Sequence, residues 1–251
     1  MPVDALFNHI GKLHRPRPWG SLLDAGTGKH SLSWIAGLET ERWTGVTGDA
    51  SVAAKLERRF ADRMRDGDRI VAGNWNDPSF LHAERYDVVL ADYLLGAVEA
   101  FAPYFQDCLF ARLRPLVAGR LYVVGLSPYP GTTDDPWGKV IVEIAQLRDA
   151  AITLAGHSTY REYPLEWCLR HLERAGFEVE DVERFPIVYG PSFIKNQLKV
   201  AERKLSLLPD PTLAAALKNA IDELRDRALE TYEAYRGTPF GADYVIDARP
   251  R

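Results

Sequence analysis

The sequence predicts a doubly wound α/β fold built on a mostly parallel sheet. Between residues 20 and 125, short β-type runs alternate with helical patterns. The runs are apolar on both faces, which is typical of strands in a parallel sheet covered by helices on both sides. Hydrophobic residues at 46% and charged residues at 26% indicate a packed globular chain. A length of 251 residues allows one such domain with a sizeable insertion.

The elements of this alternating region can be assigned in order. We expect strands at residues 21–24, 43–47, 69–72, 86–91 and 119–124, and helices from residue 31, over 52–65 and over about 97–114. After the fifth strand, a Gly/Pro-rich stretch at 127–136 predicts a long loop, because such stretches interrupt regular structure. Loops of this length in compact domains are usually functional or mobile.

The second half of the chain is more helical. We expect helices over 140–155 and from Pro164 to the stop signal at Gly176, followed by a strand at 177–185. Asp210 before Pro211 predicts a further helix start, and 244–248 predicts a last strand. These two strands complete a seven-stranded sheet. The domain scheme is therefore an N-terminal segment at 1–19, a main domain at 20–190 and 238–251, and a helical insertion between the last two strands at 191–237, which we expect to cover the substrate as a lid.

Charge and cysteine content exclude several classes of function. The net charge of −4 makes nucleic acid an unlikely partner, although basic residues at positions 58, 59, 63 and 65 form a local patch. Cys108 and Cys168 are too few and too far apart for a disulfide framework or a zinc site. The chain has no apolar window long enough to span a membrane. We expect a cytoplasmic protein; its oligomeric state is open, and a homodimer is one alternative.

A glycine-containing turn follows the first strand, and its residues indicate a ligand-binding site. The segment reads Asp24-Ala25-Gly26-Thr27-Gly28-Lys29-His30-Ser31. Two glycines let the backbone turn tightly and approach a ligand, and the next helix begins with unpaired N–H groups. Asp49 ends the second strand twenty-one residues past Gly28, the distance at which an acid can accept both hydroxyls of a ribose. This spacing indicates a site for a nicotinamide dinucleotide or for S-adenosylmethionine.

Two residues of the sequence distinguish between these two cofactors. The dinucleotide fingerprint has Gly or Ala where this chain has Ser31, and it has no charge at the position of Asp24. Asp24, Gly26 and Gly28 resemble the first motif of the class I S-adenosylmethionine-dependent methyltransferases. The resemblance covers residues 20–125, and more loosely 164–185 and 244–248. It implies a Rossmann-like methyltransferase fold, S-adenosylmethionine as cofactor and a position of Asp24 near the methionine ammonium. The chain departs from the motif at His30, where the family has a third glycine.

The resemblance implies further site residues. Asn74 and Trp75 follow the third strand, where the family places its adenine contacts. Asp92 and Tyr93 follow the fourth strand, where the family exposes residues to the methyl group, so we expect Asp92 to contact the cofactor and both residues to be catalytic. Ordinary core packing is the alternative for Trp75, and capping of the next turn is the alternative for Asp92.

Polar and aromatic residues concentrate after the fifth strand and in the inserted helices. Tyr129, Tyr160, Arg161 and Tyr189 are our candidates for substrate binding, and they suit a small aromatic or heterocyclic acceptor. Packing of the helices is the alternative for any one tyrosine. His157 is the candidate general base, because only histidine has an unperturbed pKa near neutrality. The sequence has no metal-ligand spacing, so no metal is expected.

These observations predict an S-adenosylmethionine-dependent methyltransferase that acts on a small molecule by in-line O-, N- or S-methylation. The alternatives are a non-catalytic cofactor-binding module that serves a partner protein, and an RNA or protein methyltransferase. A nicotinamide oxidoreductase ranks third, because Asp24 and Ser31 disfavour it.

Overall fold

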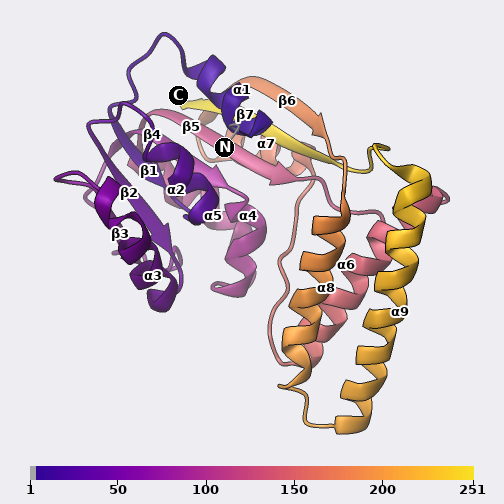
Figure 1. Cartoon of the computed structure of the whole chain (residues 1–251). Coiled ribbons are helices and arrows are strands. Elements are labelled where there is room, and N and C mark those ends of the chain that lie inside the picture. Colours follow the sequence, from indigo (N-terminus) through magenta and orange to yellow (C-terminus); the bar gives the residue numbers. More distant parts are fainter. Residues whose placement is uncertain (1–3) are drawn as a thin grey trace. The chain divides into compact units, whose positions relative to one another are not determined.

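The structure, a computed structural model, describes residues 4–251 and has the predicted seven-stranded sheet (Figure 1). The strand order is β3-β2-β1-β4-β5-β7-β6. The strands are β1 (Ser21–Asp24), β2 (Arg42–Thr47), β3 (Arg69–Ala72), β4 (Tyr86–Asp92), β5 (Val117–Leu126), β6 (Phe177–Pro186) and β7 (Ala242–Pro250). The pairs among β1 to β5 are parallel, and β7 runs antiparallel to β5. The predicted doubly wound α/β class is therefore confirmed.

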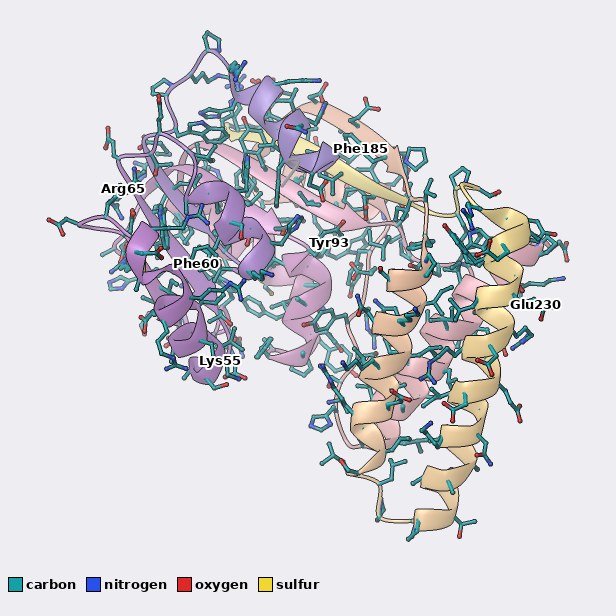
Figure 2. All side chains as sticks on the ribbon, in the orientation of Figure 1. Lys55, Phe60, Arg65, Tyr93, Phe185 and Glu230 are labelled. Carbon is teal, nitrogen blue, oxygen red and sulfur yellow. The ribbon has the colours of Figure 1, made fainter. Side chains whose placement is uncertain are left out.

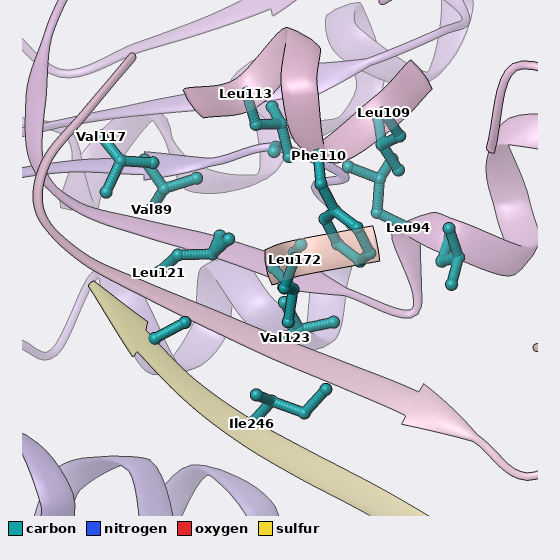
Figure 3. Close-up of a cluster of buried hydrophobic side chains, with 14 of the residues drawn as sticks. Val89, Leu94, Leu109, Phe110, Leu113, Val117, Leu121, Val123, Leu172 and Ile246 are labelled. Carbon is teal, nitrogen blue, oxygen red and sulfur yellow. The ribbon is translucent and has the colours of Figure 1, made fainter. Parts of the chain in front are cut away.

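Helices cover both faces of this sheet. One face packs against α1 (Ala5–His14), α2 (Lys29–Ile35) and α3 (Ala50–Phe60), and the other packs against α4 (Leu94–Ala97), α5 (Gln106–Leu113) and α7 (Leu165–Arg174). Figure 3 shows the second core, where Phe110 and Leu172 meet Val123 of β5. Truncating such a fully buried Leu to Ala typically costs about 2–5 kcal/mol. The two cores therefore fix the carboxyl ends of the strands, where the candidate site residues lie.

The N-terminal segment and the region after β4 differ from the sequence prediction. The sequence prediction has no helix within residues 1–19, yet α1 packs its apolar face on the sheet. Residues 1–3 of that segment lie outside the described part of the chain. The single helix predicted over about 97–114 is replaced by the short α4, a 3-10 turn and α5. Tyr104 has a φ of 66° and follows Pro103, so the chain leaves the helical conformation between α4 and α5.

The remaining helices form a second compact unit, made of residues 128–159 and 186–242. Its helices are α6 (Pro136–Leu154), α8 (Pro191–Leu205) and α9 (Pro211–Tyr235), which bury one shared apolar core (Figure 1). The predicted insertion at 191–237 contains α8 and α9, and it does lie between β6 and β7. The unit is wider than predicted because α6, before β6 in sequence, contributes Ile141 and Ile144 to the same core.

The order in which strands are added to the sheet reverses between β1 and β4, and this point is suited to binding a ligand. β1 pairs with β2 on one side and with β4 on the other, so the connections leave the sheet in opposite directions from here. Ligands of open α/β sheets bind outside the carboxyl ends of the strands at such a switch point. Asp24 ends β1 and Asp92 ends β4, so both lie there.

Candidate functional site

A cavity of about 250 Å³ opens at the carboxyl ends of the first three strands. Its walls come from residues 25–27 after β1, 46–49 at the end of β2 and 73–75 after β3. Leu94, Ala97, Val98 and Phe101 add an apolar wall, and Tyr160 adds a side chain from the segment before α7. Of the predicted site residues, Gly26, Asp49, Asn74, Trp75 and Tyr160 line this cavity.

Asp24 is a buried carboxylate whose hydrogen bonding is weak. Its residue is 0% exposed, and neither carboxylate oxygen has a hydrogen bond of normal length and angle from a described residue. Burial raises the pKa of Asp24 to about 6, and the nearby hydroxyls of Ser31 and Thr27 and the Gly26 N–H offset only part of that rise. Buried carboxylates are normally paired or hydrogen-bonded, because an unpaired one costs free energy. The arrangement therefore suits a ligand that brings a cation or N–H donors to Asp24.

The two glycines of the turn have different surroundings. A Cβ at Gly26 would lie 3.1 Å from a side-chain carbon of Leu94, so Gly26 lets α4 pack closely on the turn. A Cβ at Gly28 would meet no described atom within 4 Å. Gly28 N–H is held by the Ser31 hydroxyl at 3.1 Å, which fixes the start of α2. The space beside Gly28 is therefore available to a ligand.

His30, where the sequence departs from the methyltransferase motif, is turned toward α1. Its imidazole Nε2 lies 3.6 Å from an Asp4 carboxylate oxygen, and its ring lies 5.0 Å from the ring of Phe7. The side chain remains mostly exposed. This position explains how the chain tolerates a large residue where the family has glycine.

Asp49 and Asn74 hold two loops of the cavity in place. Asp49 caps α3, because its Oδ1 accepts hydrogen bonds from Ser51 N at 2.7 Å and Val52 N at 3.3 Å. The hydrogen bonds with Ser51 hold its pKa below the usual value, so Asp49 is charged at neutral pH. Asn74 donates from Nδ2 to the Phe101 carbonyl at 2.8 Å and accepts from Asn76 N through Oδ1.

Trp75 and Phe101 supply aromatic walls. Trp75 is 4% exposed and donates its indole N–H to the Ala25 carbonyl at 2.8 Å. Trp75 packs in the hydrophobic core, which is the alternative to a cofactor contact, and it also lines the cavity. Phe101 is 44% exposed and also lines the cavity. The sequence prediction missed Phe101 because it was placed within a continuous helix.

Asp92 ends β4 at the switch point and Tyr93, labelled in Figure 2, follows it. Neither residue lines the cavity, although the next residue, Leu94, does. Burial, followed by the negative charge of Asp24, raises the pKa of Asp92 to about 8. Tyr93 adopts the left-handed conformation, with a φ of 47°, and its N–H donates to the Val124 carbonyl. Its side chain is hydrogen-bonded to Asp243 of β7, a residue that the sequence prediction did not identify.

The four remaining candidates divide between the two units. Arg161 belongs to the sheet unit, where its backbone N–H donates to the Gly96 carbonyl and its guanidinium lies 3.7 Å from Glu99. Tyr129 and Tyr189 belong to the helical unit and contact each other through their hydroxyls. His157, in the same unit, follows α6 and has an exposed side chain. The described residues that line the cavity all belong to the sheet unit.

Within residues 4–251, no group of three or more His, Cys, Asp and Glu side chains is arranged to hold a metal ion. In the same residues, no helix combines the length and the apolar character needed to cross a membrane.

Comparison with solved structures identifies the fold. A candidate methyltransferase from Bacillus halodurans matches over 98% of this chain and 99% of its own, with a TM-score of 0.62 and 16% identity. An S-adenosylmethionine-dependent methyltransferase from Geobacter sulfurreducens, solved with S-adenosylhomocysteine, matches over 100% and 92%, with a TM-score of 0.54 and 13% identity. Coclaurine N-methyltransferase, bound to N-methylheliamine and S-adenosylhomocysteine, matches over 96% and 70%, with a TM-score of 0.56 and 14% identity. The chain has the class I methyltransferase fold.

Sequence comparisons add nothing to this result, because no family model and no curated protein sequence matches the chain. The turn with Asp24, the acid Asp49 and the residues after β3 follow three adjacent strands, and they meet at one edge of the sheet.

Proposed function

We propose that this chain is a cytoplasmic S-adenosylmethionine-dependent methyltransferase acting on a small molecule. The observation that carries the proposal is Asp24, a fully buried carboxylate without a hydrogen bond of normal geometry, which directly precedes the cavity-lining residues 25–27. An ammonium group is a ligand that such a carboxylate favours. The likeness in fold to methyltransferases solved with S-adenosylhomocysteine supports the same assignment.

The residues present fit this cofactor. Asp24 would hold the methionine ammonium, and Asp49, which is charged and lines the cavity, would accept hydrogen bonds from ribose hydroxyls. Trp75 and Phe101 would enclose the adenine ring. The open space beside Gly28 would leave room for the backbone and the cofactor to approach each other. Asn74 would act through Phe101, whose carbonyl it already holds.

The chemistry requires little more from the protein than positioning. The bound cofactor would supply an electrophilic methyl group on a sulfonium. The chain would hold the acceptor in line with that methyl group and exclude water, which are the main sources of rate enhancement in such a displacement. Asp92 and Tyr93 are proposed to contact the acceptor, and His157 remains the proposed general base for an acceptor that carries a proton. No metal is proposed in this chemistry.

Several observations favour a small acceptor over RNA. The net charge is −4, and the basic residues around α3 are partly engaged within the chain. Arg65 pairs with Asp68 and donates to Thr40, and Arg63 donates to the Ser33 carbonyl. Such contacts make these side chains less available to phosphates. Tyr160 and Arg161, together with Tyr129 and Tyr189, remain the proposed substrate-binding residues.

Calorimetric titration with S-adenosylhomocysteine tests the cofactor assignment. We expect binding in the micromolar range, with NAD and NADP as negative controls. Asp24→Asn keeps the shape and removes the charge, so it should weaken binding roughly 10- to 100-fold, the usual value for a charged hydrogen bond. Asp49→Ala should also weaken binding. Asp62→Asn, an exposed acid outside the cavity, is the matched control and should leave the affinity unchanged.

The alternatives predict different results. Binding of NAD with no binding of S-adenosylhomocysteine would favour an oxidoreductase and overturn the proposal. Binding without turnover on any acceptor, together with a stable complex with another chain, would favour a non-catalytic module. Methyl transfer to RNA or to a protein would keep the enzyme class and replace the small-molecule acceptor. A sedimentation experiment would decide between a monomer and the homodimer alternative.

A further inference from the structure

The loop between β3 and β4 contributes to the cavity although it has no helix or strand. β3 ends at Ala72 and β4 begins at Tyr86, and residues 73–75 of the intervening loop line the cavity. Gly73 N–H donates to the Thr47 carbonyl at 2.9 Å, which fixes the first residue of the loop on β2. The rest of the loop cannot use the hydrogen bonds of a helix or sheet, so individual contacts must define its position.

Arg112 of α5 holds the far half of this loop. Its Nη2 donates to the Asp77 carbonyl at 3.2 Å and to the Phe80 carbonyl. Its guanidinium carbon lies 5.6 Å from the centroid of the Trp75 ring. Arg112 is half-buried, and a partly desolvated guanidinium over an indole ring makes a favourable cation–π interaction. One side chain therefore holds both the backbone of the loop and an aromatic ring that lines the cavity.

Trp75 is held from three sides. Its indole N–H is bonded to the Ala25 carbonyl, and the ring of Phe80 meets it edge-on, with 5.4 Å between the ring centroids. Phe80 in turn lies against Gly73, where a Cβ would overlap the Phe80 ring. Arg112 supplies the third contact. Loss of Arg112 would release the Phe80 backbone and leave the indole ring with one hydrogen bond about which it can turn.

Backbone hydrogen bonds hold the turn after β1 independently of Arg112. Ala25 N–H donates to the Leu90 carbonyl of β4 at 2.8 Å, and Thr27 N–H donates to a carbonyl of β2 at 2.6 Å. A change at Arg112 should therefore displace the indole wall of the cavity and leave Asp24 in place.

We propose that Arg112 is a positioning residue for the adenosine part of the cofactor, which acts by holding the Trp75 ring in the cavity wall. This inference rests on the proposed function, in which Trp75 encloses the adenine ring. Among the described residues that line the cavity, none belongs to α5, so the effect of Arg112 must pass through the loop. The geometry of the site then depends on an element that contributes no wall of its own.

Two ligands separate the two ends of the site. S-adenosylhomocysteine carries an adenosine part and an amino-acid part, whereas 5′-methylthioadenosine lacks the ammonium and carboxylate groups. We expect Arg112→Met to weaken the binding of both ligands by the same factor, roughly 5- to 10-fold, because it removes hydrogen bonds and a cation–π contact that order the loop. Asp24→Asn should weaken the binding of S-adenosylhomocysteine alone. Calorimetry well below the thermal midpoint of each variant measures these affinities on folded protein.

Arg114 provides a matched control. It donates from Nε to the Gly176 carbonyl and from Nη2 to the Arg251 carbonyl, each at 3.0 Å, and its guanidinium carbon lies 5.5 Å from the centroid of the Phe177 ring. These contacts are of the same kind as those of Arg112, but they lie where β6 begins and β7 ends, at the opposite end of the sheet from the cavity. Arg114→Met should lower the thermal midpoint, as Arg112→Met does, and leave both affinities unchanged.

A spectroscopic measurement reports on Trp75 without any ligand. The chain has six tryptophans, so protein labelled with 5-fluorotryptophan should give six fluorine NMR signals, and Trp75→Phe identifies the signal of Trp75. Arg112→Met should shift or broaden that signal more than the others, and Arg114→Met should leave it in place. Arg112→Lys keeps a cation at the ring without the planar fork of donors, so it should restore only part of the signal position and of the affinity.

Failure of this inference can be told apart from failure of the proposed function. If the unmodified protein binds neither S-adenosylhomocysteine nor 5′-methylthioadenosine, the proposed function fails and this inference falls with it. If the unmodified protein binds S-adenosylhomocysteine but not 5′-methylthioadenosine, or if Arg112→Met changes neither affinity or weakens S-adenosylhomocysteine alone, the positioning role is overturned while the function stands. Equal losses in Arg112→Met and Arg114→Met would show a general loss of stability instead. An unmoved Trp75 signal would exclude the route through that ring.

Discussion

The ring of Phe101 packs directly over the backbone of Gly48. A Cβ at Gly48 would lie 2.5 Å from the Cδ1 atom of Phe101, closer than real Cβ contacts. Both residues line the cavity, and the Phe101 carbonyl is held by Asn74. Gly48 therefore allows one aromatic wall of the proposed cofactor site to approach the end of β2.

Gly48→Ala should weaken binding of S-adenosylhomocysteine with little effect on stability. The methyl group would displace the Phe101 ring, which is half-exposed and can turn outward at low cost. Loss of one aromatic contact corresponds to about 1 kcal/mol, or roughly fivefold in affinity. Calorimetry and thermal unfolding measure the two effects. Phe101→Leu should give a similar loss, and an unchanged affinity in both variants would show that Phe101 does not contact the cofactor.

Gly28→Ala should separate ligand binding from folding. A Cβ there would meet no described atom within 4 Å, and the backbone φ of −139° is open to any residue, so the thermal midpoint should change by less than about 2 °C. If the cofactor occupies the space beside Gly28, the methyl group would reduce its affinity about 10-fold or more. Gly11→Ala, which also adds a methyl group in open space but on α1, is the control. Equal affinities for both variants would mean that the cofactor does not approach Gly28.

The positions of the strands along the chain could be predicted from the sequence more completely than the site. Apolar runs such as 86–91 specify buried strands by composition alone, and the Asp24 turn is recognisable by its spacing. The break between α4 and α5 is only partly visible in the sequence. Pro103 signals an interruption, but Leu109, Phe110 and Leu113 continue a helical pattern, and the turn is completed by a hydrogen bond from Tyr104 N–H to the Glu99 carboxylate.

The prediction of site residues was also limited, because some of them meet only through contacts between segments that are far apart in the sequence. Asp243 lies 151 positions after Asp92, and only the antiparallel pairing of β7 with β5 brings it to the same edge. Phe101 joins the cavity because Gly48 leaves room for its ring. Signals of this kind come from packing between distant segments. A single sequence contains no periodic pattern that would reveal them.

Asp92→Asn should stabilise the ligand-free protein much more at pH 8.5 than at pH 5. The pKa of Asp92 rises from 3.8 to about 8 on folding, mainly through burial. Between these values the unfolded chain loses the proton and the folded protein keeps it, so the free energy of unfolding falls as the pH rises, and above 8 the full penalty remains. The amide has no charge to bury. Each 1 kcal/mol gained should raise the thermal midpoint by about 2–4 °C. The same midpoint difference at both pH values would contradict this prediction.

Arg161 and Glu99 are expected to position Tyr160 at the mouth of the cavity. Glu99 is 5% exposed and accepts hydrogen bonds from Gln106 Nε2 at 2.7 Å and Tyr104 N at 3.0 Å. Its remaining oxygen faces the Arg161 guanidinium, next to Tyr160 in the chain. Arg161→Met removes the charge and keeps the length of the side chain. It should release Tyr160 and speed the dissociation of S-adenosylhomocysteine.

The expected increase in dissociation rate is about two- to fivefold, because a partly exposed ion pair contributes up to about 1 kcal/mol. Stopped-flow displacement measures this rate. Tyr160→Ala should show the same increase, since Tyr160 itself lines the cavity. In the double variant Arg161→Met/Tyr160→Ala, the two effects should not add, because both act through the position of one ring. Additive effects would show that Arg161 influences the bound molecule by its own charge, which is the substrate-binding role first expected for it.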